Sequence, residues 1–203
     1  MPEENPWLSA ASAMTPVAPA AGDLQGAEAP PPTGAPAPQP LIPAPAGPAL
    51  PRRSTPPGSG RLWWLGVHGG AGESTLAALS GTAGAEHAWP VAETGRPAVV
   101  LVARTHLHGL ERARQAATEW ARGEVDVDLL GLALVADAPG RAPKALRDFS
   151  ALVAGGLPRT WRIPWIEAWR AEPPEPSLLP RPVRRLLADT AALINPESGK
   201  AAE

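Results

Sequence analysis

The stretch WWLGVHGGAGESTLAAL (residues 63–79) decides the fold, because it joins an apolar strand pattern to a helix pattern through several glycines. The apolar run at residues 61–67 has the length of a buried strand, and residues 74–81 have helical spacing. In a phosphate-binding loop, a strand enters a helix in this way and backbone N–H groups converge on an anion at the helix start. The stretch therefore predicts strand, loop and helix in that order.

The same alternation continues along the chain. Further strand patterns cover residues 97–104, 129–137 and 159–165, and amphipathic helix patterns cover residues 106–123, 142–156 and 181–194. The connection at residues 81–95 is rich in turn residues. Strands that alternate with helices favour a parallel sheet covered on both faces. We predict a small three-layer, P-loop-like α/β domain with a mostly parallel sheet, whose ligand loops follow the strands at residues 68–73, 104–109 and 137–142.

Composition divides the chain into three parts. Sixteen of its 28 prolines lie in the first 60 residues, which contain few large apolar side chains. Such a segment cannot bury enough surface to offset the entropy of ordering it. We therefore predict a disordered Pro/Ala-rich arm over residues 1–60 and the α/β domain over 61–170. Residues 171–203 are predicted to form a linker, a C-terminal helix and a frayed tail.

Charge and composition also limit the location and the partners. The chain begins with acidic residues, and no apolar stretch approaches the roughly 18 residues of a membrane span. There is no cysteine, which excludes disulfides and thiolate chemistry, and the net charge is −2. We expect a cytoplasmic protein with no membrane contact and no general affinity for nucleic acid.

The loop HGGAGEST (residues 68–75) resembles the variant phosphate loop of the ParA/MinD class of partition and division-site ATPases. That pattern runs Lys, Gly, Gly, any residue, Gly, Lys and two Ser or Thr. The matching positions are Gly69, Gly70, Gly72, Ser74 and Thr75, whereas His68 and Glu73 stand at the two lysine positions. The resemblance implies binding of ATP or GTP with magnesium, but both cations are absent and the segment of the switch aspartates is reduced to residues 81–96.

A second resemblance covers residues 61–170. The segments WWLGVHGGAGEST, LVARTHLHGL, LLGLALVADAPGR and RIPWIEAWR are similar to an uncharacterised actinobacterial family of P-loop-like proteins met near mobile elements. This similarity implies no established activity.

Glutamate in place of lysine reverses the charge beside the anion site. Two unit charges about 4 Å apart interact by about 4 kcal/mol at an effective dielectric constant of 20, so ordinary nucleotide hydrolysis is disfavoured. A carboxylate in the first helical turn is itself favourable. We expect the carboxylate of Glu73 to lie near the loop N–H groups or the Ser74 hydroxyl, in place of a phosphate. The structural alternative is a tight glycine turn whose glutamate only starts the helix.

Residues Gly69, Gly70, Gly72, Glu73, Ser74 and Thr75 are accordingly predicted to form a vestigial phosphate loop, with no catalytic residue and no cofactor. The alternative is a nucleotide hydrolase in which Arg104 or Arg141 replaces the missing lysine.

Three other motifs carry less chemistry. GESTL around Ser74 resembles a nucleophile elbow, but every histidine lies at or before His108, so none follows in the order that hydrolases of this type require. DAPG (residues 137–140) fits a magnesium and γ-phosphate sensor, but a turn at a strand end is the favoured interpretation. His106 and His108 are two residues apart, a spacing that favours hydrogen-bonded or solvated histidines over a metal site.

Tryptophan is frequent, with eight in the chain. Trp63 and Trp64 are adjacent, so a regular strand would place them on opposite faces. Trp161, Trp165 and Trp169 recur at every fourth position, for which core packing is the default interpretation. Because tryptophan and arginine also anchor interfaces, Trp165, Trp169 and Arg170 form the predicted partner-binding surface. The sequence thus favours a non-catalytic adaptor that binds a protein partner, and leaves homodimerisation open.

Overall fold

The computed structural model describes residues 29–39, 50–56 and 59–195 of the chain. The main sheet contains five parallel strands in the order β3-β2-β5-β6-β7. Their bounds are β2 Leu62–Gly66, β3 Ala83–Gly84, β5 Ala98–Arg104, β6 Asp128–Val135 and β7 Thr160–Ile163. Numbered in chain order, these strands follow the order 2-1-3-4-5, which is common among doubly wound α/β proteins.

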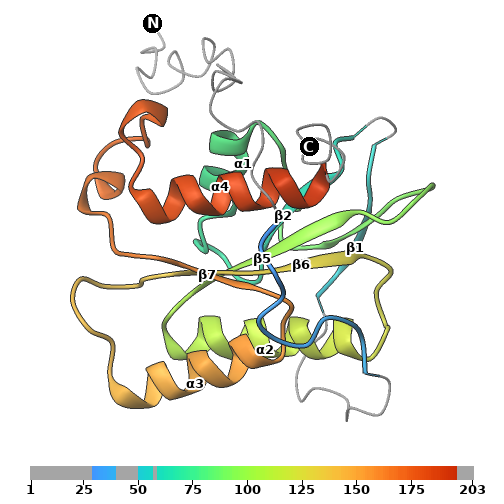
Figure 1. Ribbon diagram of the computed structural model, residues 1–203, viewed down its shortest axis with the longest axis horizontal. Helices are drawn as coiled ribbons and strands as arrows, with labels where there is room; N and C mark the ends of the chain where they lie inside the picture. Colours follow the sequence, from blue (N-terminus) through green and yellow to red (C-terminus); the bar gives the residue numbers. More distant parts are fainter. Residues whose placement is uncertain (1–28, 40–49, 57–58, 196–203) are drawn as a thin grey trace, which may run out of the picture.

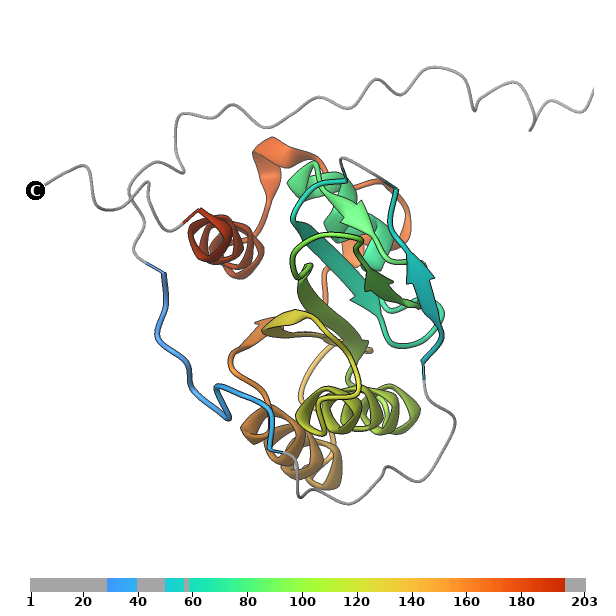
Figure 2. The ribbon, with the colours of Figure 1, turned by 90° about the vertical axis from the view of Figure 1, so that its right-hand side faces the viewer.

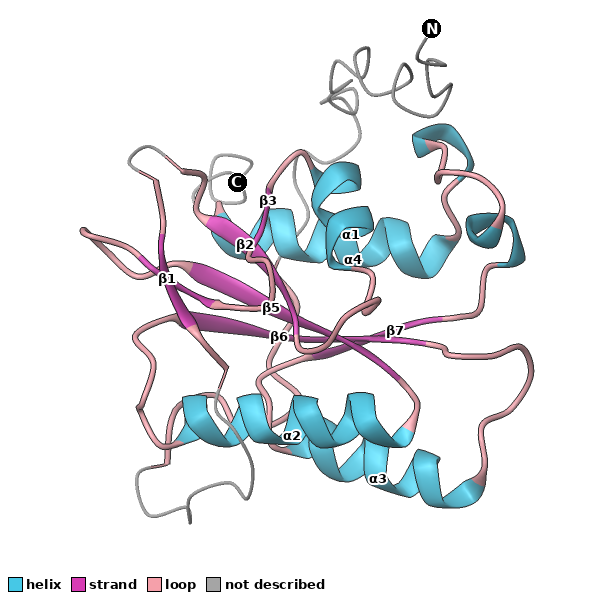
Figure 3. Ribbon diagram, turned by 180° about the vertical axis from the view of Figure 1, so that it is seen from behind, coloured by secondary structure: helices cyan, strands magenta, loops and turns pink. Residues whose placement is uncertain are grey.

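Helices cover both faces of this sheet (Figures 1 and 3). One face carries α1 (Glu73–Ser80) and α4 (Arg181–Ile194), and the other carries α2 (Leu107–Ala121) and α3 (Lys144–Gly155). Two 3₁₀ helices, η1 (Glu167–Arg170) and η2 (Pro176–Leu178), connect β7 to α4. The predicted three-layer α/β architecture with a parallel sheet is confirmed.

Each face of the sheet has its own apolar core, as strand alternation requires. Trp63 packs with Val99 and α2, whereas its neighbour Trp64 packs with Val100 and α4. The two tryptophans therefore point to opposite faces, as the sequence predicts. The Trp64 indole N–H reaches Ser80 Oγ at 2.8 Å and Thr82 Oγ1 at 2.9 Å, which satisfies the one polar group that this side chain buries.

Part of the predicted disordered arm belongs to the folded unit, which corrects the boundary at residue 60. Leu50 is 4 % exposed and packs in the core, and the next residues form β1 (Arg52–Ser54), parallel to β4 (Trp89–Val91). Residues 29–39 run past the β7 edge of the sheet from α4 towards α2 and α3 (Figure 2). The N–H groups of Thr33 and Gln39 in this segment donate to the carbonyls of Pro158 and Ala121. Residues 1–28 and 40–49 lie outside the described residues.

The C-terminal helix is also part of the folded unit and not a separate extension. α4 spans the predicted residues 181–194, and Val183 and Leu186 are fully buried against the sheet. The predicted division at residue 170 therefore does not separate two structural parts. The last residues, 196–203, for which a frayed tail was expected, lie outside the described residues.

The turn-rich connection contains structure that its composition did not reveal. The sequence predicted no strand at residues 81–95, yet β3 pairs with β2 and β4 pairs with β1 in this segment. β3 has only two residues and β1 reads Arg-Arg-Ser, so neither carries an apolar pattern. Within the described ranges, every helix is too short or too polar to cross a bilayer.

Candidate functional site

The glycine loop, residues 67–72, lies where the connections of the main sheet change direction. β2 lies between β3 and β5 in this sheet. Along the chain, the next strand of the sheet, β3, pairs on one side of β2, and the strand after it, β5, pairs on the other side. Crevices that bind ligands form at such switch points, beyond the carboxyl ends of the strands. At this edge, His68 of the loop after β2 contacts Arg104 and His106.

The loop that the sequence predicts as an anion cradle turns at two left-handed glycines. Gly70 (φ 74°) and Gly72 (φ 105°) adopt left-handed conformations that a side chain would disfavour. Ala71 N–H donates to the His68 carbonyl at 3.3 Å and closes the turn. Gly69, Gly70 and Ser74 are exposed, Thr75 is half-buried, and α1 starts after Gly72 with no side chain capping its N-terminus. The predicted loop residues therefore adopt the expected strand, loop and helix arrangement.

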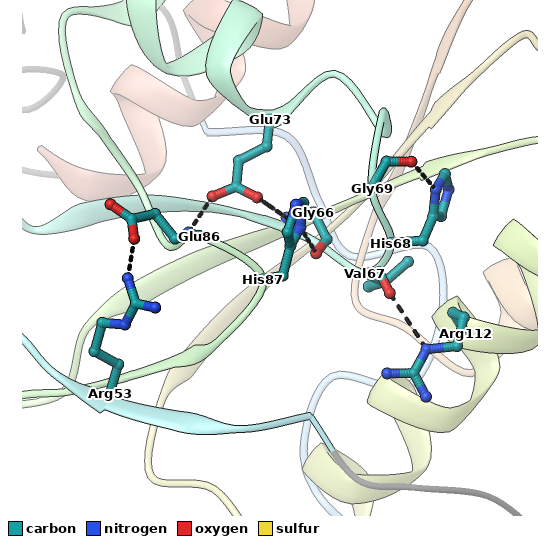
Figure 4. Close-up of polar contacts among 9 residues, drawn as sticks. All are labelled: Arg53, Gly66, Val67, His68, Gly69, Glu73, Glu86, His87 and Arg112. Atoms are coloured by element: carbon teal, nitrogen blue, oxygen red, sulfur yellow. Dashed lines mark hydrogen bonds and ion pairs between the residues drawn. The ribbon is translucent and has the colours of Figure 1, made fainter.

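Glu73 points away from this cradle (Figure 4). Its side chain is 8 % exposed, and its Oε2 accepts the Gly66 N–H at 2.9 Å while its Oε1 accepts the Glu86 N–H. The sequence predicted that the Glu73 carboxylate would lie near the N–H groups of the loop or the Ser74 hydroxyl, and this prediction is wrong. The donors are instead the last residue of β2 and the turn after β3, because the side chain folds back between these two strand ends.

The turn that Glu73 holds is conformationally costly. Glu86 (φ 51°) and His87 (φ 59°) are consecutive non-glycine residues in the left-handed region. His87 Nδ1 lies 2.8 Å from the Gly66 carbonyl, which can only accept, so Nδ1 carries the proton. The same atom lies 3.2 Å from Glu73 Oε2. Glu73 and Gly66 thus form the anchor of this turn.

Arg104 joins the loop to the neighbouring strand end. Its Nε donates to the Gly70 carbonyl at 3.2 Å, and its Nη1 donates to the Ala136 carbonyl at 2.9 Å, just beyond β6. The guanidinium therefore spans the carboxyl edge of β5 and fixes the loop on one side. Arg112 of α2 approaches the same loop, with Nε 3.4 Å from the Val67 carbonyl (Figure 4).

Three histidines gather beside the loop, although the sequence showed only two of them together. The His68 ring lies 4.9 Å from that of His106 and 6.2 Å from that of His108. His106 Nδ1 accepts the Gly109 N–H at 2.9 Å and caps α2, while His108 is exposed. The helix cap formed by His106 was not predicted from the sequence. In the part of the chain that the structure describes, no group of three or more His, Cys, Asp or Glu side chains could hold a metal.

His68 is the buried member of the three. Its Nε2 accepts the Arg104 N–H at 3.0 Å, and its Nδ1 lies 2.9 Å from the Gly69 carbonyl, so the neutral ring protonated at Nδ1 satisfies both contacts. Burial lowers the pKa of His68, and repulsion from His106, His108 and Arg104 adds to the effect, although the Gly69 carbonyl acts against it. His68 therefore serves as a neutral link between the loop and β5.

The other predicted site residues lie at two further places. Asp137, the first residue of DAPG, is exposed, and its N–H donates to Thr105 Oγ1 at 3.2 Å. In the segment after β7, Trp165 Nε1 donates to Glu167 Oε2 at 2.6 Å. The guanidinium carbon of Arg170 lies over the Trp165 ring, 5.3 Å from its centroid. Trp169 packs partly against the core on the α4 side. Trp161, Trp165 and Trp169 do not share one helix face, because the segment is a strand, a turn and a 3₁₀ helix.

A second buried carboxylate, that of Glu119 on α2, was not predicted from the sequence. It is 1 % exposed, and it accepts the Leu50 N–H at 3.0 Å and the Trp89 indole N–H at 2.8 Å. One signal was available, because Glu119 follows the buried Ala116 at the i, i+3 spacing of the apolar face. Its donors come from distant segments that no local pattern identifies.

Comparison with known proteins gives one match. The model of a family of unknown function (DUF6668) matches residues 60–187, which include the main sheet, the glycine loop and the first half of α4. Neither a curated protein nor a solved structure is detectably similar to the chain. The relationship to the ParA/MinD class stays a prediction. Because the match spans more than half of its length, the chain belongs to the family of unknown function DUF6668.

Proposed function

We propose that this protein is a non-catalytic adaptor or regulatory protein with a degenerate Walker A loop, and that it binds a protein partner. The observation that carries the proposal is the burial of Glu73. In a working loop, the lysine at this position reaches the terminal phosphates. Glu73 instead turns inward and uses both carboxylate oxygens to hold Gly66 and Glu86. The residue has a structural task that leaves the phosphate position without a cation.

The contacts of Arg104 support the same conclusion. A replacement for the missing lysine would need a guanidinium that is free to meet phosphate oxygens. Arg104 donates to the Gly70 and Ala136 carbonyls, so moving it to a ligand would break both bonds and release the loop. Hydrogen bonds from a charged donor are worth about 1.5–3 kcal/mol each. Arg141, the other predicted replacement, is exposed on the loop after β6.

The proposed partner surface is formed by Trp165, Trp169 and Arg170. Arg170 is exposed and Trp165 is half-buried, and the two stack on each other outside the sheet. Tryptophan and arginine carry much of the binding energy in many protein interfaces, because they offer large apolar area with polar groups at the rim. A preformed Arg–Trp stack also reduces the entropy cost of ordering these side chains on binding.

One observation favours the alternative, a ParA/MinD-like nucleotide hydrolase. α1 begins with no side-chain cap after two left-handed glycines, so the N–H groups of its first turn face a region that suits an anion. In that case ATP or GTP with magnesium would bind at residues 69–75, and the proposal of a non-catalytic protein would fail.

Titration of the full chain with ATP and GTP, each with magnesium, separates the two functions. We expect no phosphate release and no saturable change at the loop, followed by tryptophan fluorescence and by amide NMR signals of Gly69 and Gly70. Saturable binding with phosphate release would overturn the proposal.

For the partner surface, affinity capture with wild type and Arg170→Glu is compared with Arg114→Glu, an exposed control on α2. A partner lost equally in both variants would contradict the assignment.

A further inference from the structure

A pocket lined with arginine lies at the outer edge of the main sheet, away from the glycine loop. It has a volume of about 360 Å³, is open to solvent on one side, and is lined by three segments: residues 30–33, Arg159 with the edge strand β7, and residues 181–189 of α4. Figure 2 shows residues 29–39 crossing this edge beside α4. Two strands, β5 and β6, separate β7 from the loop-bearing strand β2. We call it the arginine pocket, after Arg159, Arg162, Arg181 and Arg185.

The charges around the arginine pocket are unbalanced. Four guanidinium groups line it with one carboxylate, that of Asp189. Asp189 is already engaged, because its Oδ2 accepts the Trp161 indole N–H at 2.8 Å and lies 3.7 Å from Arg185 Nε. Arg159 donates to the Pro30 carbonyl at 2.7 Å, so the N-terminal segment is fixed as one wall. Like charges gathered in this way favour a ligand with at least two negative charges.

Two further observations concern the β7 side of the pocket. Thr160 is a lining residue, but its Oγ1 is buried and has no hydrogen-bond partner among the described residues. Because this oxygen is closed to solvent, the guanidinium groups are the groups that a ligand in the pocket would contact. Burial lowers the pKa of Arg159, and the nearby Asp189 carboxylate acts against this effect. The arginines therefore carry the case for an anion.

We propose that the arginine pocket binds a small organic phosphate, of the nucleotide or sugar phosphate class. A phosphate monoester carries about −1.5 to −2 charges and accepts paired N–H bonds from arginine in a fork geometry. The pocket volume of about 360 Å³ lies in the range of small-molecule sites, about 300–1,000 Å³. The wall formed by residues 30–33 favours a compact ligand over a nucleic acid strand.

The test is calorimetric titration of the full chain with adenosine 5′-monophosphate and with inorganic pyrophosphate, with adenosine as the uncharged control. We expect saturable binding of both phosphates and none of adenosine. In the double variant Arg181→Ala/Arg185→Ala, affinity should fall at least about tenfold, since two charge-assisted contacts are removed. Both side chains are exposed, so the variant should fold. Arg114→Ala/Lys144→Ala removes the same charge elsewhere and should bind like wild type.

Arg162→Ala gives a second, independent measurement. Arg162 lines the pocket and is exposed, so Tm should change little. Affinity for the monophosphate should nevertheless fall by about threefold or more, since one charge-assisted contact is removed. A variant that lost binding only because it unfolded would lose Tm as well. The nucleotide titration of the glycine loop is repeated in Arg181→Ala/Arg185→Ala, which separates any signal at the loop from one at the arginine pocket.

Three outcomes would overturn the inference. The first is no binding of either phosphate at millimolar concentration. The second is binding that the double variant leaves unchanged. The third is tighter binding of a 20-nucleotide single-stranded DNA that displaces the monophosphate, because it would make this edge a nucleic acid surface.

Discussion

Glu73 Oε2 accepts the backbone N–H of Gly66 at 2.9 Å, across the glycine loop that separates the two residues. The contact is so close that a Cβ atom on Gly66 would lie 2.6 Å from that oxygen. The Glu73 carboxylate therefore closes the base of the loop, because it accepts a hydrogen bond from the last residue of β2, the strand that precedes the loop. This relationship explains why glutamate is compatible with a loop of this shape, although it does not occupy the cradle.

The first prediction concerns the charge at position 73. Glu73→Gln should destabilise the protein by about 1–3 kcal/mol, because an amide can accept one of the two N–H groups but turns its own donors towards the other. Glu73→Lys should cost about 3–5 kcal/mol, since a buried ammonium would face the Gly66 and Glu86 donors. Urea unfolding of the three proteins measures the difference, and equal stability would contradict the anchoring role.

The second prediction uses two glycines of the same region. Gly66→Ala should destabilise by about 1–3 kcal/mol, because the new Cβ meets Glu73 Oε2 at 2.6 Å and His87 Nδ1 at 3.0 Å. Gly69→Ala is the matched control, since no atom lies within 4 Å of its Cβ and its φ is negative. It should change stability by less than about 0.5 kcal/mol. Thermal unfolding of both variants tests the pair, and similar losses in the two would show that Gly66 is not a special position.

The sequence predicted the main sheet and its helices because their signals are local. Continuous apolar runs at β5 and β6 and helical spacing in α2 and α3 appear within each segment, so the elements match to within about two residues. The short strands β1, β3 and β4 depend on partners elsewhere in the chain. β1 is entirely exposed and forms because Pro51, Arg52 and Thr55 meet the segment around β4.

The glycine loop was predictable for a similar reason, whereas the direction of Glu73 was not. Glycine spacing shows where a strand turns into a helix, but a glutamate side chain can rotate to either side of a helix start. Its inward rotamer is fixed by the Glu86 N–H, thirteen residues later in a turn with two left-handed residues. The arginine pocket was equally hidden. Its arginines come from β7, the residue before it and α4, and one wall comes from residues 30–33, which the composition had assigned to a disordered arm.

The third prediction concerns Glu119 and the N-terminal boundary. Glu119→Ala leaves the Leu50 N–H and the Trp89 indole N–H without their acceptor and should cost about 2–4 kcal/mol. Glu111→Ala, an exposed change on the same helix, should cost less than about 0.5 kcal/mol.

The N-terminal boundary is tested by truncation. Removing residues 1–60 should lower the free energy of unfolding more than removing residues 1–49, because Leu50 and β1 are then lost. Urea unfolding compares all four, and a chain starting at residue 61 that is as stable as one starting at residue 50 would contradict this boundary.

The last prediction concerns pH and His68. Burial lowers the pKa of its folded form below the unfolded value of about 6.5, so the unfolded chain binds more protons between these two values. The free energy of unfolding should therefore be highest above about pH 6.5 and should fall as the pH is lowered through the folded pKa. Protonation at Nε2 would also remove the acceptor of the Arg104 N–H. His68→Gln keeps an oxygen that can accept this N–H but has no titrating group, so it should flatten the dependence, whereas the exposed His108→Gln should leave most of it. Urea unfolding at intervals between about pH 5 and 8 gives the slopes, and an unchanged slope in His68→Gln would assign the dependence to another group.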